Sequence, residues 1–168
     1  MERLQKHFGK LKTASIILLF FTGVNAIIAG TLFMIDPTGS KMGVSTSYLS
    51  NAPFANFLIP GITLFVVNGL MNVLTAILTL KNYKHFPSLI ILQGLLLSGW
   101  IIMQVIWVRD FNALHFSMLF IGVSLIILGW ILKRVSKHSK DFQLDTIIEK
   151  LVENVLSNWT IKEVLTHH

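Results

Sequence analysis

The stretch Phe54–Leu80, FANFLIPGITLFVVNGLMNVLTAILTL, decides the fold. A run of about 20 apolar residues is long enough to cross roughly 30 Å of hydrocarbon as a helix. In lipid, a single segment satisfies its backbone polar groups only as a helix. Three further runs of similar length cover residues 14–35, 87–108 and 113–132. The sequence therefore predicts an all-α, polytopic membrane protein whose transmembrane domain, residues 14–132, is a four-helix bundle.

Pro60 leaves two starting points for the second span. If Pro60 lies in the first helical turn, the span runs over about residues 60–80, and residues 54–59 lie along the outer interface. If the helix begins at Phe54, Pro60 kinks it instead. We prefer the first interpretation, because residues 60–80 are already long enough to cross the membrane.

The composition agrees with a membrane protein. The 168 residues are 53% hydrophobic and 13% charged, with a mean hydropathy of +0.67, whereas soluble domains are about 25% charged. The net charge of +6 comes mostly from residues that border the spans, so a nucleic-acid partner is not expected. The chain has no cysteine, which excludes thiolate metal sites and thiol–disulfide chemistry.

Lysine and arginine positions predict the orientation. Four lie in residues 1–13, two in the 81–85 link and four in residues 133–140, whereas the opposite side has two, Lys41 and Arg109. By the positive-inside rule, both termini are cytoplasmic and the protein lies in the plasma (inner) membrane among membrane lipids. A basic start before an apolar run also describes a signal peptide that is cleaved near Ala26. We prefer a retained helix, because the run continues past that point.

Residues 133–168 are predicted to form a cytoplasmic tail. Apolar residues between Leu144 and Trp159 recur at the spacing of an amphipathic helix, which we place at about 146–159. Thr146 and Glu149 have the form of a capping box at its start. From Asp141 onward the tail has five acidic residues and two lysines, which favours a protein partner over anionic lipid. Residues 144–159 are the candidate surface for that partner or for a homo-oligomer.

The middle of each span lacks Asp, Glu, Lys and Arg, which proton relays and charged-substrate transporters normally need. Neutral polar side chains occur instead. The first interpretation is hydrogen bonding between helices, at about 0.6 kcal/mol per pair. The alternative is a polar-lined cavity that holds a lipid-like or quinone-like molecule. The candidate intramembrane cluster is Asn25, Asn68, Asn72, Gln93, Trp100 and Gln104.

A second candidate cluster, of charged residues and one histidine, is predicted at the outer ends of the spans: Asp36, Arg109, Asp110 and His115. Asp36 and Arg109 are expected to form a salt bridge there, or Arg109 to bind a lipid phosphate or carboxylate. A third interpretation is that Arg109 only extends to the membrane interface. We predict no catalytic residue, metal site or cofactor, since the sequence has no recognisable nucleophile–base pair, phosphate-binding loop or metal-ligand motif.

Several short patterns carry a resemblance. F-x-x-F-x-I-P-G over Phe54–Gly61, Asn68-Gly69, Gln93-Gly94 and W-x-x-x-Q at Trp100–Gln104 resemble a group of small, uncharacterised bacterial four-helix membrane proteins. The resemblance covers about residues 14–132. In size and topology the chain is more distantly similar to the DoxX-like family, whose members are linked to redox complexes. No residue role is transferred from either group.

Three functions are compatible with these features. The first is a non-enzymatic scaffold or accessory subunit that binds a partner through its tail helix. The second is binding or transport of a neutral or lipid-like molecule in an intramembrane cavity. The third, implied by the DoxX-like resemblance, is a quinone-linked role beside a redox complex.

Overall fold

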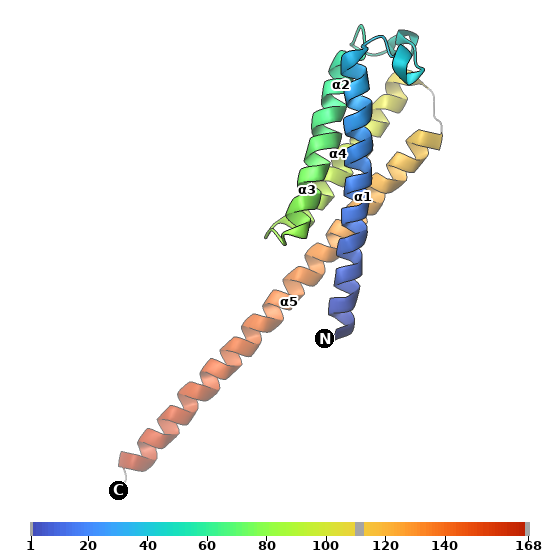
Figure 1. The fold of residues 1–168 in the computed structure, drawn as a ribbon. Helices are drawn as coiled ribbons and strands as arrows, with labels where there is room; N and C mark the ends of the chain where they lie inside the picture. The colour runs from blue at the N-terminus through green and yellow to red at the C-terminus, as the bar shows by residue number, and fades with distance from the viewer. Residues whose placement is uncertain (1, 110–112, 167–168) are drawn as a thin grey trace. The chain divides into compact units, whose positions relative to one another are not determined.

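The computed structural model describes residues 2–109 and 113–166, with side chains described for residues 7–109, 113–137 and 147–152. The described residues form helices and turns, without a strand (Figure 1). The predicted all-α fold with four spans is confirmed, because four helices are long and apolar enough to cross a membrane. They are His7–Ile35, Leu58–Leu80, Phe86–Val108 and Ala113–Lys137. The chain forms two compact units, Met1–Leu132 and Lys133–His168.

The first span is longer than the apolar run. Helix α1 is Glu2–Ile35, so the basic segment predicted to precede the span forms the first turns of the same helix. Residues 2–13 contain Leu, Gln, Lys and Arg, which are good helix formers, and Gly9 is the only strong helix breaker among them. At its other end α1 stops before Pro37, as the turn residues predict.

The second span is a continuous helix in three parts: α2 (Leu58–Thr63), the π-helix η3 (Leu64–Leu70) and α3 (Met71–Leu80). It begins two residues before the preferred Pro60 start. The Leu58 amide donates to Asn56 Oδ1 at 3.0 Å, just before the helix, whose N-cap residue is Phe57. Pro60 lies in the first turn, where a missing N–H costs little.

The remaining spans follow the predicted order. Helix α4 is Phe86–Val108, with Pro87 in its first turn. Arg109, the residue that follows it, has a left-handed backbone conformation. Helix α5 is Ala113–Thr166. Between α1 and α2, the loop of residues 36–57 contains two short 3-10 helices, η1 (Ser40–Met42) and η2 (Thr46–Leu49).

Glycines bring the spans together in two close pairs. In the first pair, a Cβ atom added at Gly30 of α1 would lie 2.8 Å from Gly61 O of α2. In the second, a Cβ atom at Gly94 of α4 would lie 2.6 Å from Gly122 O of α5. Small residues at such positions let helix backbones approach and gain van der Waals contact, which drives helix association in lipid.

The apolar core lies toward the 81–85 link. Leu19 of α1, Ala76 of α3 and Leu125 of α5 belong to one buried cluster, and α4 contributes Phe86 and Ile90. Because every span contributes to this cluster, the helices are held together at that end of the unit. The 36–57 loop, at the opposite end, contributes no residue to this cluster.

In the second unit, residues 133–166 belong to α5, so no helix begins at the capping box predicted at Thr146 and Glu149. The predicted amphipathic segment, residues 146–159, is therefore part of a longer helix. Its described apolar side chains are well exposed, from 49% to 59%: Ile147, Ile148, Leu151 and Val152. The side chains of residues 144–146 and 153–159 lie outside the described part.

Candidate functional site

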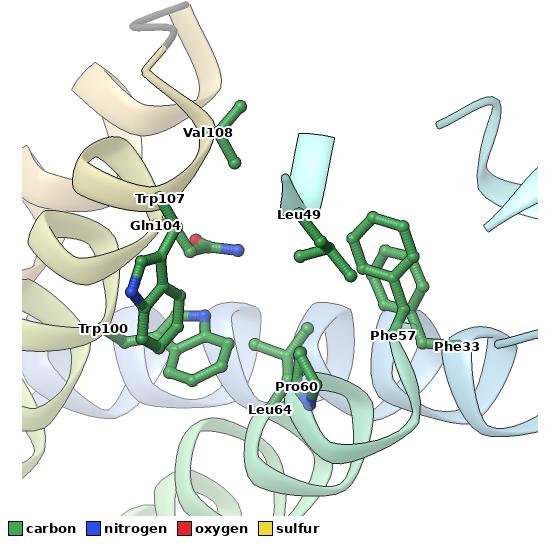
Figure 2. Close-up of a pocket in the computed structure, with 9 residues that line it drawn as sticks. All are labelled: Phe33, Leu49, Phe57, Pro60, Leu64, Trp100, Gln104, Trp107 and Val108. Carbon is green, nitrogen blue, oxygen red and sulfur yellow. The ribbon is translucent and has the colours of Figure 1, made fainter. Parts of the chain in front are cut away.

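The loop end of the first unit contains a cavity of about 360 Å³. Small-molecule sites occupy roughly 300–1,000 Å³, so this volume is at the lower end of that range. All four spans and the 36–57 loop line the cavity. A smaller hollow of about 50 Å³ adjoins it and shares several of its residues, including Phe33, Trp100 and Gln104 (Figure 2).

Helical spacing explains why two spans supply most of the wall. From α1 the lining residues recur at one side of the helix: Thr22, Asn25, Ala26, Ala29 and Phe33. From α4 they do the same: Leu97, Trp100, Ile101, Gln104 and Val108. Residues three or four positions apart share a helix face, so each span gives the cavity a continuous stripe. The walls are therefore mostly apolar, with polar groups at selected levels.

Asn68 supplies the most unusual polar group of the cavity. Its side chain is 0% exposed, and both Nδ2 and Oδ1 lack a hydrogen-bond partner within the protein. Thr22 Oγ1 and Trp100 Nε1, which belong to two other lining residues, are also buried without a partner. Most buried polar groups in proteins are paired, and leaving one unpaired costs about 1–3 kcal/mol. Unpaired donors and acceptors thus occur in lining residues on three spans.

The π-helix η3 sets the direction of Asn68. At its end the Met71 amide donates to Val66 O, five residues back, instead of four as in an α-helix. Its Gly69 approaches α1 so closely that an added Cβ would lie 3.2 Å from Ile27 N. Asn68, the preceding residue, lines the cavity. Single turns of π-helix occur often at functional sites.

Four of the six predicted intramembrane residues line the cavity: Asn25, Asn68, Trp100 and Gln104. Asn72 and Gln93 are buried outside it, at 0% and 1% exposure. Asn72 Nδ2 donates to Asn68 O at 2.8 Å, whereas Asn72 Oδ1 and Gln93 Oε1 have no partner. Asn25 is exposed, and its Nδ2 donates to Phe21 O at 2.7 Å.

Aromatic side chains surround the loop end of the cavity. Phe33 and Phe57 stack with ring centroids 4.8 Å apart. Figure 2 shows the Trp100 indole and the Gln104 amide extending from α4 toward the hollow that these rings, Pro60, Leu64 and Leu49 also border. The loop is joined to α4 by an edge-to-face contact between Phe54 and Trp107, whose ring centroids are 5.2 Å apart. Sequence reasoning missed the loop as a wall, because its short 3-10 turns lack a regular apolar period.

The structure describes three of the four residues of the predicted outer charged cluster: Asp36, Arg109 and His115. Asp36 and Arg109 make no ion pair; Asp36 instead accepts hydrogen bonds from its own loop. Ser40 Oγ and Thr38 Oγ1 donate to the Asp36 carboxylate at 2.6 Å each, and the Lys41 amide donates at 2.8 Å. Led by the Ser40 bond, these contacts hold the pKa of Asp36 well below its usual range. The predicted salt bridge was wrong because short loop donors satisfy the carboxylate first.

The other members of that cluster have separate places. Arg109 is exposed at the end of α4, and Asp110 lies outside the described residues. His115 is buried, at 7% exposure, and lines the cavity from α5. The sequence predicts His115 at the outer end of the fourth span, and it is the third residue of α5; its burial in the cavity wall was not predicted.

The described lining of the cavity is mostly apolar, with a few polar side chains. Among its described lining residues, none is Asp, Glu, Lys or Arg, while amide, hydroxyl and indole groups are available. Among the residues that the structure describes, no three His, Asp or Glu side chains lie close enough together to hold a metal ion. The arrangement can hold and orient a neutral molecule.

Comparisons of the chain with protein-family models, curated proteins and solved structures found no match.

Proposed function

We propose that this protein binds a neutral, amphipathic small molecule in the cavity of its transmembrane unit. The observation that carries the proposal is Asn68, whose fully buried amide lines the cavity with both polar atoms unpaired. An unpaired buried amide is costly in an apolar environment. A ligand that offers a donor and an acceptor recovers that cost on binding, and therefore gains affinity from a site that is already formed.

The available groups define the class of ligand. Asn68 Nδ2 and Trp100 Nε1 are donors, Asn68 Oδ1 is an acceptor, and the Thr22 hydroxyl is both. They suit a hydroxyl, carbonyl or amide group on the ligand. A charged head group is disfavoured, because the described lining has no Asp, Glu, Lys or Arg to pair with it. A quinone head group and the head of a neutral single-chain lipid both belong to this class.

The cavity volume supports a small occupant. About 360 Å³ accommodates a head group and the first part of one chain better than a whole two-chain phospholipid. We further propose that both termini lie in the cytoplasm of a bacterial inner membrane, as the excess of Lys and Arg in residues 1–13, 81–85 and 133–140 supports. The cavity would then lie in the outer half of the membrane.

Native mass spectrometry of protein extracted into lipid nanodiscs tests the proposal. We expect a neutral molecule of defined mass on the wild-type protein and on Thr79→Val, and its loss from Asn68→Leu. Thr79 is the matched control, since it is a buried polar residue of the same span that lies outside the cavity. The Asn72 bond to Asn68 is made to the backbone oxygen, so the Leu variant leaves it intact. A bare wild-type mass, or equal retention by Asn68→Leu, would contradict the proposal.

A scaffold function through the tail is a second candidate. Ile147, Ile148, Leu151 and Val152 form an exposed apolar strip on the tail helix. Exposed apolar strips with polar surroundings often mark protein–protein contacts. We propose that residues 144–159 bind a cytoplasmic partner or a second copy of the chain. A protein that co-purifies with the full chain, but not after deletion of residues 141–168, would support this second function; unchanged co-purification would exclude it.

A further inference from the structure

The spans converge at one end of the transmembrane unit and separate at the other. Leu19 of α1 and Leu125 of α5 share the apolar core that lies toward the 81–85 link. From that level toward the 36–57 loop, α1 and the first turns of α5 move apart (Figure 1). Glycine contacts keep α1 against the second span and α5 against α4. The separation therefore falls between the two close pairs.

The cavity reaches the surface along this separation. Asn25 of α1 and Leu114 of α5 both line it, and both are exposed, Leu114 at 63%. On the loop side, Phe57 and the adjoining Leu49 are buried at 8% and 6% exposure, whereas Met42 and Tyr48, which also line the cavity, are 37% and 42% exposed. The opening at Asn25 and Leu114 is on the side of the bundle, because both residues belong to helices that are long and apolar enough to lie in lipid.

We infer that the ligand passes between the cavity and the bilayer through a lateral opening bounded by Asn25 and Leu114, and is a membrane-dissolved, single-chain neutral amphiphile. This inference depends on the proposed function and adds the source and orientation of the ligand. Its polar group reaches Asn68 and Thr22, and its chain extends through the opening into lipid. Asn25 is compatible with this path. Its Nδ2 already donates to Phe21 O, so this donor keeps its partner while an apolar chain passes.

Trp100 provides a direct test, because it lines the cavity from α4. A single-tryptophan protein is made by changing Trp107, Trp130 and Trp159 to Phe, and is placed in vesicles whose phosphatidylcholine chains are brominated at mid-chain. A second protein keeps only Trp130, which is 50% exposed on α5, as a control for ordinary lipid contact. We expect both tryptophans to be quenched by the brominated chains, since a chain that enters the opening reaches Trp100.

Two further variants link the quenching to this opening. Ala29→Phe adds a ring to the α1 wall of the cavity and should abolish quenching of Trp100 while leaving Trp130 unchanged. Leu114→Ala removes bulk from an exposed position, so it should fold normally and preserve or increase quenching of Trp100. Quenching of Trp130 without Trp100, quenching of Trp100 that Ala29→Phe leaves unchanged, or stronger quenching of Trp100 by aqueous acrylamide than by lipid would each overturn the route.

The quenching and mass-spectrometry experiments separate the two proposals. A bound neutral mass without lipid quenching of Trp100 keeps the proposed function and overturns lateral access. Quenching of Trp100 on a protein with a bare mass shows an opening that no ligand uses, and it removes the proposed function together with the inference.

Discussion

The side-chain amide of Asn72 donates to the backbone oxygen of Asn68 at 2.8 Å, at the point where the π-helix η3 meets α3. The bond gives the Asn68 carbonyl a buried donor, but it leaves the Asn68 side chain without a partner in the protein. Asn72 therefore supports the backbone, while Asn68, on the preceding turn, belongs to the cavity wall and has an unpaired side-chain amide. Such unpaired buried groups usually persist where they serve binding or catalysis.

Replacing Asn68 by Leu should stabilise the ligand-free protein while it abolishes binding. Leu has a similar size and removes two buried polar atoms that have no partner, so the free energy of unfolding should rise by about 1 kcal/mol. The measurement is chemical unfolding in detergent, after any bound molecule has been removed. Asn68→Ala serves as the control, because it removes the same amide but leaves a void. If Leu destabilises as much as Ala, the Asn68 side chain has a partner in the resting protein.

The four spans were predictable because the length and apolar content of a segment are enough to identify a helix that can cross a membrane. The π-helix was not, since a regular α period placed Asn68 and Asn72 on one stripe with one shared role. Asn68 lies within the π-helix and lines the cavity, whereas Asn72 lies in α3, outside the cavity, and donates to the Asn68 carbonyl. No propensity marks this turn in a single sequence.

Some of the cavity-lining residues could be predicted because they lie on regular helices. Gln104 and Trp100 were found because their helix is regular, and helical spacing then gives the shared face. The loop wall, with Tyr48 and Phe57, could not be predicted, because its position depends on contacts that are distant in sequence. The Asp36–Arg109 ion pair was expected because both residues lie at the outer ends of spans. In the structure the Asp36 carboxylate accepts hydrogen bonds from its own loop instead.

Asp36 should make the order of the 36–57 loop depend on acid. Hydrogen bonds from Ser40 and Thr38 lower the pKa of this carboxyl, so the loop gains stability above the unfolded pKa of about 3.9. That stability is lost as the pH falls through the still lower folded pKa, and pH changes between 5 and 8 should have no effect through this group. Asp36→Asn should reproduce the acid state at neutral pH and speed hydrogen exchange of the Lys41 amide. Asn51→Ala, in the same loop, is the control; equal exchange in both variants would contradict this assignment.

Deleting residues 141–168 should leave the transmembrane unit folded. The unit ends at Leu132, and no described cavity residue lies beyond Met118. The basic segment 133–140, which is expected to fix the orientation, remains in the shortened protein. The thermal unfolding midpoint and the mass of any bound molecule should match those of the full chain. A shortened protein that aggregates on extraction, while the full chain does not, would show that the tail is needed for folding.

Gly94→Ala should weaken the contact between α4 and α5. The new methyl carbon would lie 2.6 Å from Gly122 O and 2.8 Å from Ile126 N, which are backbone atoms that move only if the helices separate. Forcing such an overlap costs about 1–3 kcal/mol, and Leu125 in the adjoining core would lose contacts as α5 shifts.

Gly99→Ala is the matched control on the same helix, because nothing lies within 4 Å of the added carbon. Ala there should be neutral or stabilising by up to about 1 kcal/mol through helix propensity. Unfolding of the two variants side by side in the same detergent distinguishes these effects, and equal stability would mean that the α4–α5 crossing is not held by this close approach.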